Sequence, residues 1–278
     1  MTSVPNRQPS TAAAVNASVV ATGRNGSIGA ALPAAVSGLM TRLEAGESFM
    51  AEELVRSRAQ VLIHLAALTS VQDCERDPDR TGKLNVDGSL KWLRAAARSR
   101  LDHFIFVSSS HVFLPTAEPV WLKPDRAMDS TSVYGKSKAE AELRLAEEAR
   151  LLGIRLSIAR VFSVIAPPGK ALRPFYLQAG LQRRARERDF SPLPGHQNVR
   201  DFITTDQISQ QLMRLVESNQ STGGTYHICS GVPKSVRELA IEEMKVAGIG
   251  PSEMNPMFVA TDAKPNYLIS KPIELNEA

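Results

Sequence analysis

Residues 18–29 read SVVATGRNGSIG, a short apolar run that leads into three glycines spaced three apart, at Gly23, Gly26 and Gly29. Residues 26–36, GSIGAALPAAV, then take up helical spacing. We therefore expect a strand, a tight turn and a helix, in that order. Glycines between a strand and a helix allow the sharp turn and let the backbone approach a ligand closely.

The same alternation of strand and helix patterns continues along the chain. Strands that alternate with helices indicate parallel βαβ units, so the fold class is predicted to be α/β, with a Rossmann-type doubly wound parallel sheet. A second strand is expected within 38–44. Further strands are expected at 59–68, 103–110, 154–164 and 223–231, and helices at 90–99 and 134–152.

The amino-acid composition changes near Pro167, where prolines become frequent and no long apolar run follows until residue 223. We interpret residues 18–166 as the main domain. Residues 167–278 are expected to form mainly a smaller C-terminal substrate-binding lobe, with some segments returning to the main domain. Residues 1–17 are expected to be a flexible tail.

Composition limits the classes of function. Of 278 residues, 43% are apolar and 22% charged, which is typical of a globular protein, and the net charge of +4 is too mild for a dedicated nucleic-acid binder. Cys74 and Cys229 have no ligand spacing for a metal and do not suggest a disulfide framework. No apolar run approaches the roughly 20 residues that span a bilayer, and the N-terminus does not resemble a secretory signal. We expect a cytoplasmic protein that binds neither nucleic acid nor membrane.

The glycine turn is a candidate site for a dinucleotide, because a pyrophosphate can lie against bare backbone amides at the start of a helix. A plain glycine-rich loop is the alternative. The region after the turn offers Arg42 and Glu44, and Arg24 lies within the turn. Arginine can hold a ribose 2′-phosphate, so NAD or NADP is expected as the cofactor, with a slight preference for NADP. Both arginines could instead be ordinary surface residues.

Residues 134–138, YGKSK, place Tyr134 and Lys138 four apart on one face of a predicted helix. Such a pair is common on solvent-facing helices. A lysine ammonium beside a phenol also lowers the pKa of the phenol, which would make Tyr134 a general acid/base. Upstream, a predicted strand ends in three serines, Ser108 to Ser110, and could deliver a hydroxyl to the same edge of the sheet.

With these motifs in chain order, the sequence resembles the extended short-chain dehydrogenase/reductase superfamily, in its NAD-dependent epimerase/dehydratase family of nucleotide-sugar enzymes. The resemblance runs from about Ser18 to Lys271. It is carried by TGRNGSIG, VLIHLAAL, NVDGS, YGKSKAEAE, RDFITTDQIS and GGTYHICSG. It implies a nucleotide-sugar substrate and a homodimer.

The resemblance also assigns roles to residues. Tyr134 is the implied acid/base, Lys138 lowers its pKa and binds the nicotinamide ribose, and Ser109 is the hydroxyl partner. Substrate contacts are implied for Ser110, His111, Ser163 and Arg200, with Arg183 and Arg184 as weaker candidates. The implied cofactor-binding residues are Gly23, Arg24, Asn25, Gly26, Ser27, Ile28, Gly29, Arg42, Leu65, Ala66, Ala67, Asn85, Val107, Tyr134 and Lys138. No metal ligand is expected.

Departures from the family pattern narrow the reaction. Sugar 4,6-dehydratases of the family carry Asp-Glu after the catalytic hydroxyl, whereas Ser110 and His111 stand here. Dehydration is therefore not expected. The family's N-V-Y-G-P is replaced by residues 163–167, SVIAP, which suggests an atypical sugar or nucleotide pocket, and the unusually short segment between glycine turn and HLAA strand resembles the dTDP-4-dehydrorhamnose reductase branch.

The predicted function is an NAD(P)-dependent epimerase or ketoreductase that acts on a nucleotide-activated sugar by hydride transfer. A non-catalytic NAD(P)-binding sensor or scaffold of the same fold is the alternative, although such a protein has no need of Ser109, Tyr134 and Lys138 together. An RNA-binding derivative would need more aromatic residues than the 5% present.

Overall fold

The computed structural model describes residues 18–39, 46–167, 170, 172–218 and 223–272. The predicted tail and the predicted cofactor residue Arg42 lie outside these residues, as does most of the predicted second strand.

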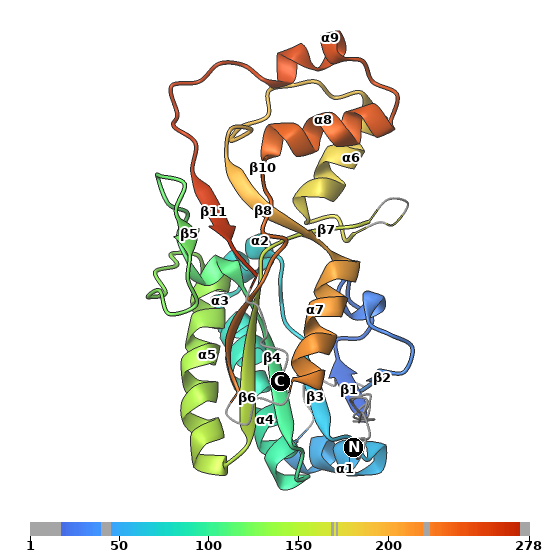
Figure 1. The fold of residues 1–278 in the computed structure, drawn as a ribbon, viewed down its shortest axis with the longest axis vertical. Helices are drawn as coiled ribbons and strands as arrows, with labels where there is room; N and C mark the ends of the chain where they lie inside the picture. Colours follow the sequence, from blue (N-terminus) through green and yellow to red (C-terminus); the bar gives the residue numbers. More distant parts are fainter. Residues whose placement is uncertain (1–17, 40–45, 168–169, 171, 219–222, 273–278) are drawn as a thin grey trace, which may run out of the picture.

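Six strands form one parallel sheet in the order β2-β1-β3-β4-β6-β9 (Figure 1). Every pairing in this sheet is parallel. The predicted α/β fold with a Rossmann-type sheet is confirmed. The strands are β1 Val19–Thr22, β2 Ser37–Gly38, β3 Val61–His64, β4 His103–Ser109, β6 Arg155–Val161 and β9 Gly224–Ile228.

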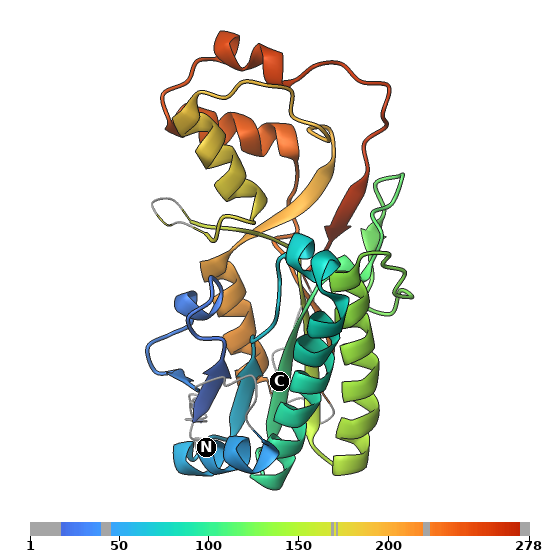
Figure 2. The ribbon, with the colours of Figure 1, turned by 180° about the vertical axis from the view of Figure 1, so that it is seen from behind.

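Alternate residues of the central strands β3 and β4 enter two different cores. Leu62, Phe104 and Phe106 pack with α1 (Glu47–Ser57), α4 (Gly88–Arg98) and α5 (Val133–Leu152) on one face. Ile63 and Ile105 pack with α7 (Thr205–Glu217) on the other face (Figure 2). Full burial of each large side chain stabilises the fold by about 1.5–3 kcal/mol. The near-continuous apolar runs in the sequence are therefore strands covered on both faces.

The predicted helix over residues 26–36 is wrong. Only Gly29–Ala31 form a single 3₁₀ turn, η1, and Leu32 is already extended. Proline at position 33 explains the difference, because its ring has no N–H to donate and would clash with the carbonyl of Gly29 four residues earlier in an α-helix. The first strand is therefore followed by a loop that only starts as a helix.

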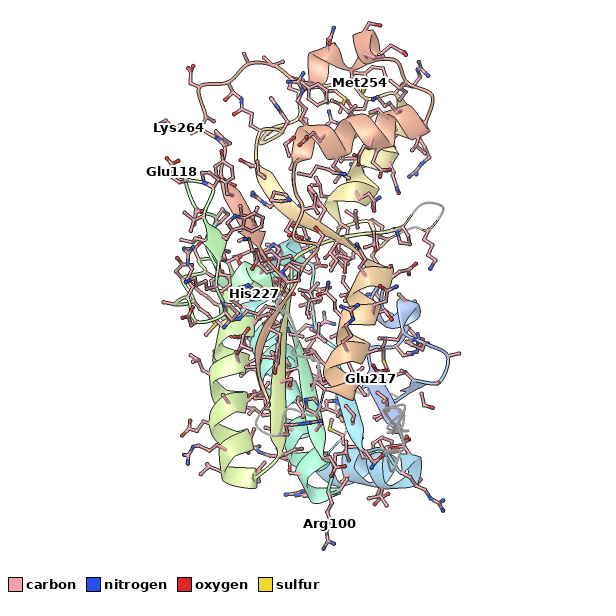
Figure 3. The ribbon with its side chains drawn as sticks, in the orientation of Figure 1. Arg100, Glu118, Glu217, His227, Met254 and Lys264 are labelled. Atoms are coloured by element: carbon pink, nitrogen blue, oxygen red, sulfur yellow. The ribbon has the colours of Figure 1, made fainter. Side chains whose placement is uncertain are left out.

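The second lobe lies beyond the carboxyl ends of the large sheet. Its strands run in the order β10-β8-β11-β5, and β7 pairs with β8. Figure 3 shows Met254 near the far end of this lobe and Arg100 at the opposite end of the molecule. The strands are β5 Trp121–Leu122, β7 Ser163–Ile165, β8 Val199–Thr204, β10 Pro233–Ser235 and β11 Tyr267–Ser270; the helices are α6 Leu177–Glu187, α8 Val236–Val246 and α9 Pro251–Met254.

The chain crosses between the two lobes more than once. From β8 it enters α7 and then β9, which joins the edge of the large sheet next to β6. The lobe has its own apolar core, with Leu181, Leu239 and Met244 fully enclosed. The remaining short elements are α2 Val71–Arg76, α3 Pro78–Gly82, a π-helical turn Lys83–Asp87, and the 3₁₀ turns η3 Ser110–Val112 and η4 Asn255–Met257.

Strand order sets the position of the ligand edge. The chain runs from β1 outward to β2 and then returns to the other side of β1 as β3. Ligands of open parallel sheets bind at such a reversal, outside the carboxyl ends of the strands.

Candidate active site

A cavity of about 1640 Å³ opens at this edge, between the large sheet and the second lobe. It is lined by the glycine turn, by Ser109, Tyr134 and Lys138, and by Arg183, Arg184 and Arg200 from the second lobe. The ends of β1, β3, β4 and β6 all reach it. One cavity thus contains the regions that the sequence assigned separately to cofactor, catalysis and substrate.

The glycine turn brings bare backbone to the cavity. Gly23 has a φ of 69°, and Gly26 N–H donates to the Gly23 carbonyl at 2.9 Å. A Cβ on Gly29 would lie 2.4 Å from the Gly23 carbonyl oxygen, so only glycine fits. The Thr22 hydroxyl accepts from Ala66 N–H at 3.2 Å and ties the turn to the segment after β3. The turn is therefore fixed and free of side-chain bulk, as binding of a pyrophosphate requires.

Arg24 has a structural task in this turn. Its guanidinium donates to the carbonyls of Gly29, Leu32, Pro33 and Val36 and so holds the loop after the turn in place. The predicted fork for a ribose 2′-phosphate is thus occupied by backbone oxygens. The expectation of NADP therefore loses its support from Arg24, and its other residue, Arg42, is outside the described chain.

Small side chains continue the cofactor end of the cavity. Leu65, Ala66 and Ala67 follow β3, and Val107 on β4 lies behind them; all four line the cavity. Asn85 does not line it and is fully buried. Its side-chain amide instead accepts from Leu68 N–H and donates to the Ser137 hydroxyl at 3.0 Å. Asn85 therefore connects the segment after β3 to α5 from behind the cavity lining.

The three predicted catalytic side chains meet at the centre of the cavity. Ser109 ends β4, and its hydroxyl lies close enough to the Tyr134 phenol to act on the pKa of that phenol. Ser132 caps the N-terminus of α5 by accepting from Gly135 N–H, so Tyr134 and Lys138 lie one turn apart on the buried face of that helix. Lys138 is 2% exposed, and its Nζ lies 4.1 Å from the centre of the Phe106 ring.

Burial shifts the pKa values of this group. Burial raises the pKa of Tyr134, and the contact with Ser109 acts in the opposite direction. Burial lowers the pKa of Lys138 to about 7, while the charge of Glu142 acts to raise it. Burial of the phenol therefore has a larger effect on the Tyr134 pKa than the contact with Ser109. With a pKa of about 7, the Lys138 side chain changes between ammonium and neutral amine near neutral pH.

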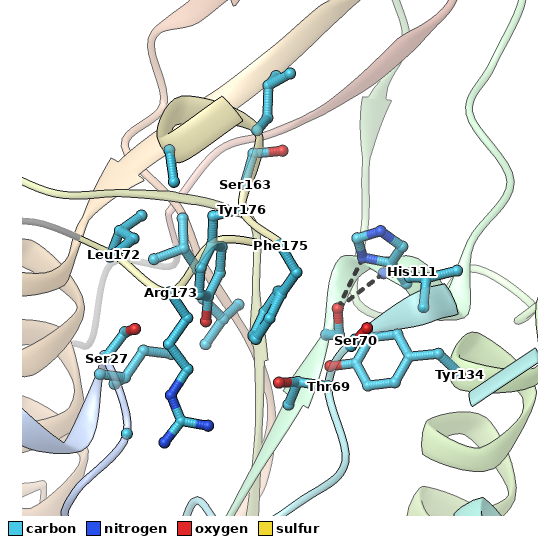
Figure 4. A pocket seen from close by; sticks show the side chains of 18 of the residues that line it. Ser27, Thr69, Ser70, His111, Tyr134, Ser163, Leu172, Arg173, Phe175 and Tyr176 are labelled. Carbon is cyan, nitrogen blue, oxygen red and sulfur yellow. Dashed lines mark hydrogen bonds between the residues drawn. The ribbon is translucent and has the colours of Figure 1, made fainter. Parts of the chain in front are cut away.

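His111 extends the catalytic group toward the substrate end. Its Nδ1 lies 3.1 Å from the Ser109 hydroxyl, and its ring meets the Tyr134 ring edge-on at 5.6 Å between centres (Figure 4). Burial, and then the charge of Arg200, lower the pKa of His111. Its imidazole is therefore neutral at pH 7. The Nδ1 atom can accept a hydrogen bond from the Ser109 hydroxyl or donate one to it, depending on the tautomer.

The other residues predicted to contact substrate differ in whether they line the cavity. Ser163, Arg183, Arg184 and Arg200 line the cavity together with His111. Ser110 is not among the lining residues: it is 1% exposed and begins the turn η3.

An ion pair beneath the site was missed in the sequence. The Arg160 guanidinium on β6 donates to both carboxylate oxygens of Glu142 on α5, with distances of 2.6 to 3.0 Å. The Ser108 hydroxyl donates to the same carboxylate. The side chains of Arg160 and Glu142 are only 5% and 3% exposed. Glu142 follows Lys138 by one helical turn, so the pair anchors the catalytic helix to the sheet and places a negative charge near the lysine.

Metal and membrane features are not found in the described chain. Among the residues described, no group of three or more His, Cys, Asp or Glu side chains could hold a metal ion. None of the described helices is both long and apolar enough to cross a bilayer.

Comparison with known proteins gives concordant results. GDP-6-deoxy-D-mannose reductase of Pseudomonas aeruginosa is 31% identical over 64% of this chain and 60% of its own. UDP-glucose 4-epimerase of Rhizobium meliloti is 25% identical over 70% of this chain and 64% of its own. The chain thus spans less than two thirds of the length of either relative.

Solved structures share the fold. UDP-glucose 4-epimerase of Thermus thermophilus, solved with NAD, superposes with a TM-score of 0.74 at 18% identity, covering 91% of this chain and 90% of that one. RMD from Pseudomonas aeruginosa, solved with NADPH, gives 0.73 at 22% identity over 92% and 90%. The sequence profile of the NAD dependent epimerase/dehydratase family matches residues 19–229, most of the chain. This protein therefore belongs to the NAD dependent epimerase/dehydratase family.

Proposed function

We propose that this protein is an NAD(P)-dependent oxidoreductase that acts on the sugar of a nucleotide-activated sugar, either as an epimerase or as a ketoreductase. The observation that carries the proposal is the meeting of Ser109, Tyr134 and Lys138 in one cavity, which bare glycine backbone and arginines also line.

The residues present fit a dinucleotide. Gly23 to Gly29 expose backbone to the cavity, and Leu65 to Ala67 leave room beside it. In this proposal the glycine turn holds the pyrophosphate, and Lys138 binds the nicotinamide ribose. When bound, the nicotinamide supplies a hydride acceptor or donor for one carbon of the sugar.

The protein's own residues handle the oxygen and the proton. The Ser109 hydroxyl orients the sugar oxygen, and Tyr134 takes or returns its proton through the phenol. The Lys138 ammonium stabilises negative charge on the phenolate, because both groups are removed from water. Since burial alone raises the pKa of Tyr134, this positive charge is needed before the phenol can act as a base.

The arginines support an anionic substrate. Arg183, Arg184 and Arg200 come from α6 and β8 and line the end of the cavity beyond His111. Burial lowers the pKa of Arg200, because it removes the charged guanidinium from water. A bound diphosphate would offset the free-energy cost of this lost hydration. We assign this end to the nucleotide diphosphate and the space between it and Tyr134 to the sugar.

A panel assay tests the proposal. Purified protein is mixed with nucleotide sugars and with their 4-keto forms, with NAD or NADP added in either redox state, and nicotinamide absorbance is followed. Net oxidation of reduced cofactor by a keto-sugar identifies a ketoreductase, and sugar interconversion without net oxidation identifies an epimerase. Both activities should disappear in Tyr134→Phe. Cofactor binding with no turnover on any sugar would favour the sensor alternative.

A further inference from the structure

The glycine turn has lost the usual partner of an anion-binding site. A long helix after such a turn attracts negative charge through its N-terminal amides, equivalent to roughly half a positive charge. Here the turn is followed only by the three residues Gly29–Ala31 of η1. Arg24 donates to backbone carbonyls of this loop, including those of Gly29 and Leu32. Its guanidinium is therefore already engaged by the protein. A pyrophosphate at this turn therefore needs positive charge from another part of the chain.

A segment from the other lobe reaches the turn. Residues 172–176 lie between β7 and α6 and end at the start of α6, and in Figure 4 Arg173 and Tyr176 lie beside Ser27. The Arg173 Nη2 donates to the Asn25 carbonyl at 3.4 Å. The segment thus reaches the glycine turn at two places, through Arg173 at Asn25 and through Tyr176 at Ser27.

The remaining donors of Arg173 are available for a ligand. A guanidinium has five N–H groups in a planar fork that suits phosphate oxygens. Arg173 is exposed and lines the cavity, and it makes no ion pair with any residue in the described part of the chain. Arg183 and Arg184, by contrast, belong to the substrate end. Arg173 is therefore a side-chain cation at the glycine turn that has no ion pair among the described residues and, unlike Arg24, donates to only one backbone carbonyl there.

We propose that Arg173 binds the pyrophosphate of the dinucleotide and so replaces the attraction of the missing first helix. The inference rests on the proposed function for its ligand. It also links the two lobes, because the same segment continues into α6, which carries Arg183 and Arg184. Binding at the glycine turn therefore fixes the start of the helix that faces the nucleotide sugar.

Calorimetry on the full chain with two probes tests this role. ADP-ribose carries the pyrophosphate, and adenosine lacks it. Arg173→Gln should weaken ADP-ribose binding about 10- to 100-fold, as expected for a lost charge-assisted contact, and change adenosine binding by less than about twofold. Arg173→Lys, which keeps the charge but not the fork, should lie between. Arg100→Gln removes the same charge at the opposite end of the molecule (Figure 3) and should change neither.

Each result decides the matter. Selective loss of ADP-ribose affinity in Arg173→Gln, with an unchanged melting temperature, supports the inference. Equal weakening of both probes would show that Arg173 only braces the turn, and unchanged ADP-ribose binding would show that it has no role in binding; either result overturns the inference alone. If the unmodified protein binds neither ADP-ribose nor NAD(P), the inference and the cofactor assignment of the proposed function fail together.

Discussion

Replacement of Glu142 by glutamine should destabilise the fold by about 3–5 kcal/mol, because it leaves the buried Arg160 guanidinium without its counter-charge. Both side chains are almost fully enclosed, and Arg160 makes three hydrogen bonds to the carboxylate. Unfolding entropy of about 2.1 cal/mol/K per residue gives roughly 0.58 kcal/mol/K for a chain of 278 residues. The expected fall in melting temperature is therefore about 5–9 °C, measured by calorimetry.

The double variant Glu142→Leu/Arg160→Met is the matched control. It removes both charges and keeps apolar volume, so it should recover more than half of the lost stability. A single variant that melts within about 1 °C of the unmodified protein, or a double variant no more stable than the single one, would refute the account of this pair.

The same change should alter the pH dependence of turnover. Burial lowers the Lys138 pKa to about 7, and the Glu142 charge partly opposes the shift. Loss of that charge moves the Lys138 pKa further down. If the ammonium is the active form, turnover falls as pH rises through this pKa, so the decline should occur at lower pH in Glu142→Gln. A decline at unchanged or higher pH would contradict the assigned electrostatic role.

Three further changes test separate parts of the site. Arg24→Lys should lower the melting temperature by several degrees, because an ammonium cannot reach the carbonyls of the turn as a fork, and it should leave the ratio of NAD to NADP affinity unchanged; a selective loss of NADP affinity would restore Arg24 as a phosphate ligand. Gly29→Ala should abolish cofactor binding in a binding assay, since its Cβ would lie 2.4 Å from a carbonyl oxygen, whereas Gly82→Ala, with nothing within 4 Å, should be neutral; normal binding by Gly29→Ala would disprove the tight turn. His111→Ala should reduce kcat up to about tenfold through loss of the Ser109 contact, with cofactor affinity unchanged; a variant with normal kcat would remove His111 from the catalytic group.

Sequence patterns predicted the large sheet well, because strands covered on both faces are continuous apolar runs. The first helix was wrongly predicted, since the small residues of 26–36 fit helical spacing and only Pro33 opposes it. Strand β8 was missed because Arg200 and Asp201 interrupt its apolar pattern, yet Asp201 is buried and accepts from the amides of Ser230 and Gly231. A buried carboxylate whose partners lie about 30 positions away leaves no periodic signal.

The three candidate catalytic residues could be proposed from the sequence because each belongs to a local motif. The residues that contact them from distant parts of the chain could not. Glu142 and Arg160 lie 18 positions apart on a helix and a strand, and only the packing of α5 on the sheet brings them together. Arg173 contacts Asn25 across 148 positions, through the return of a loop from the second lobe. Such contacts depend on topology rather than on spacing.

Transfer of a labelled hydride tests the central claim most directly. The protein is incubated with a 4-keto nucleotide sugar and with NADH or NADPH that carries deuterium at the transferable position, and the sugar is analysed by mass spectrometry after a single turnover. The account predicts one deuterium on the former carbonyl carbon, formed by the unmodified protein and not by Tyr134→Phe. Cofactor that binds tightly while every sugar in the panel stays unlabelled would contradict the account.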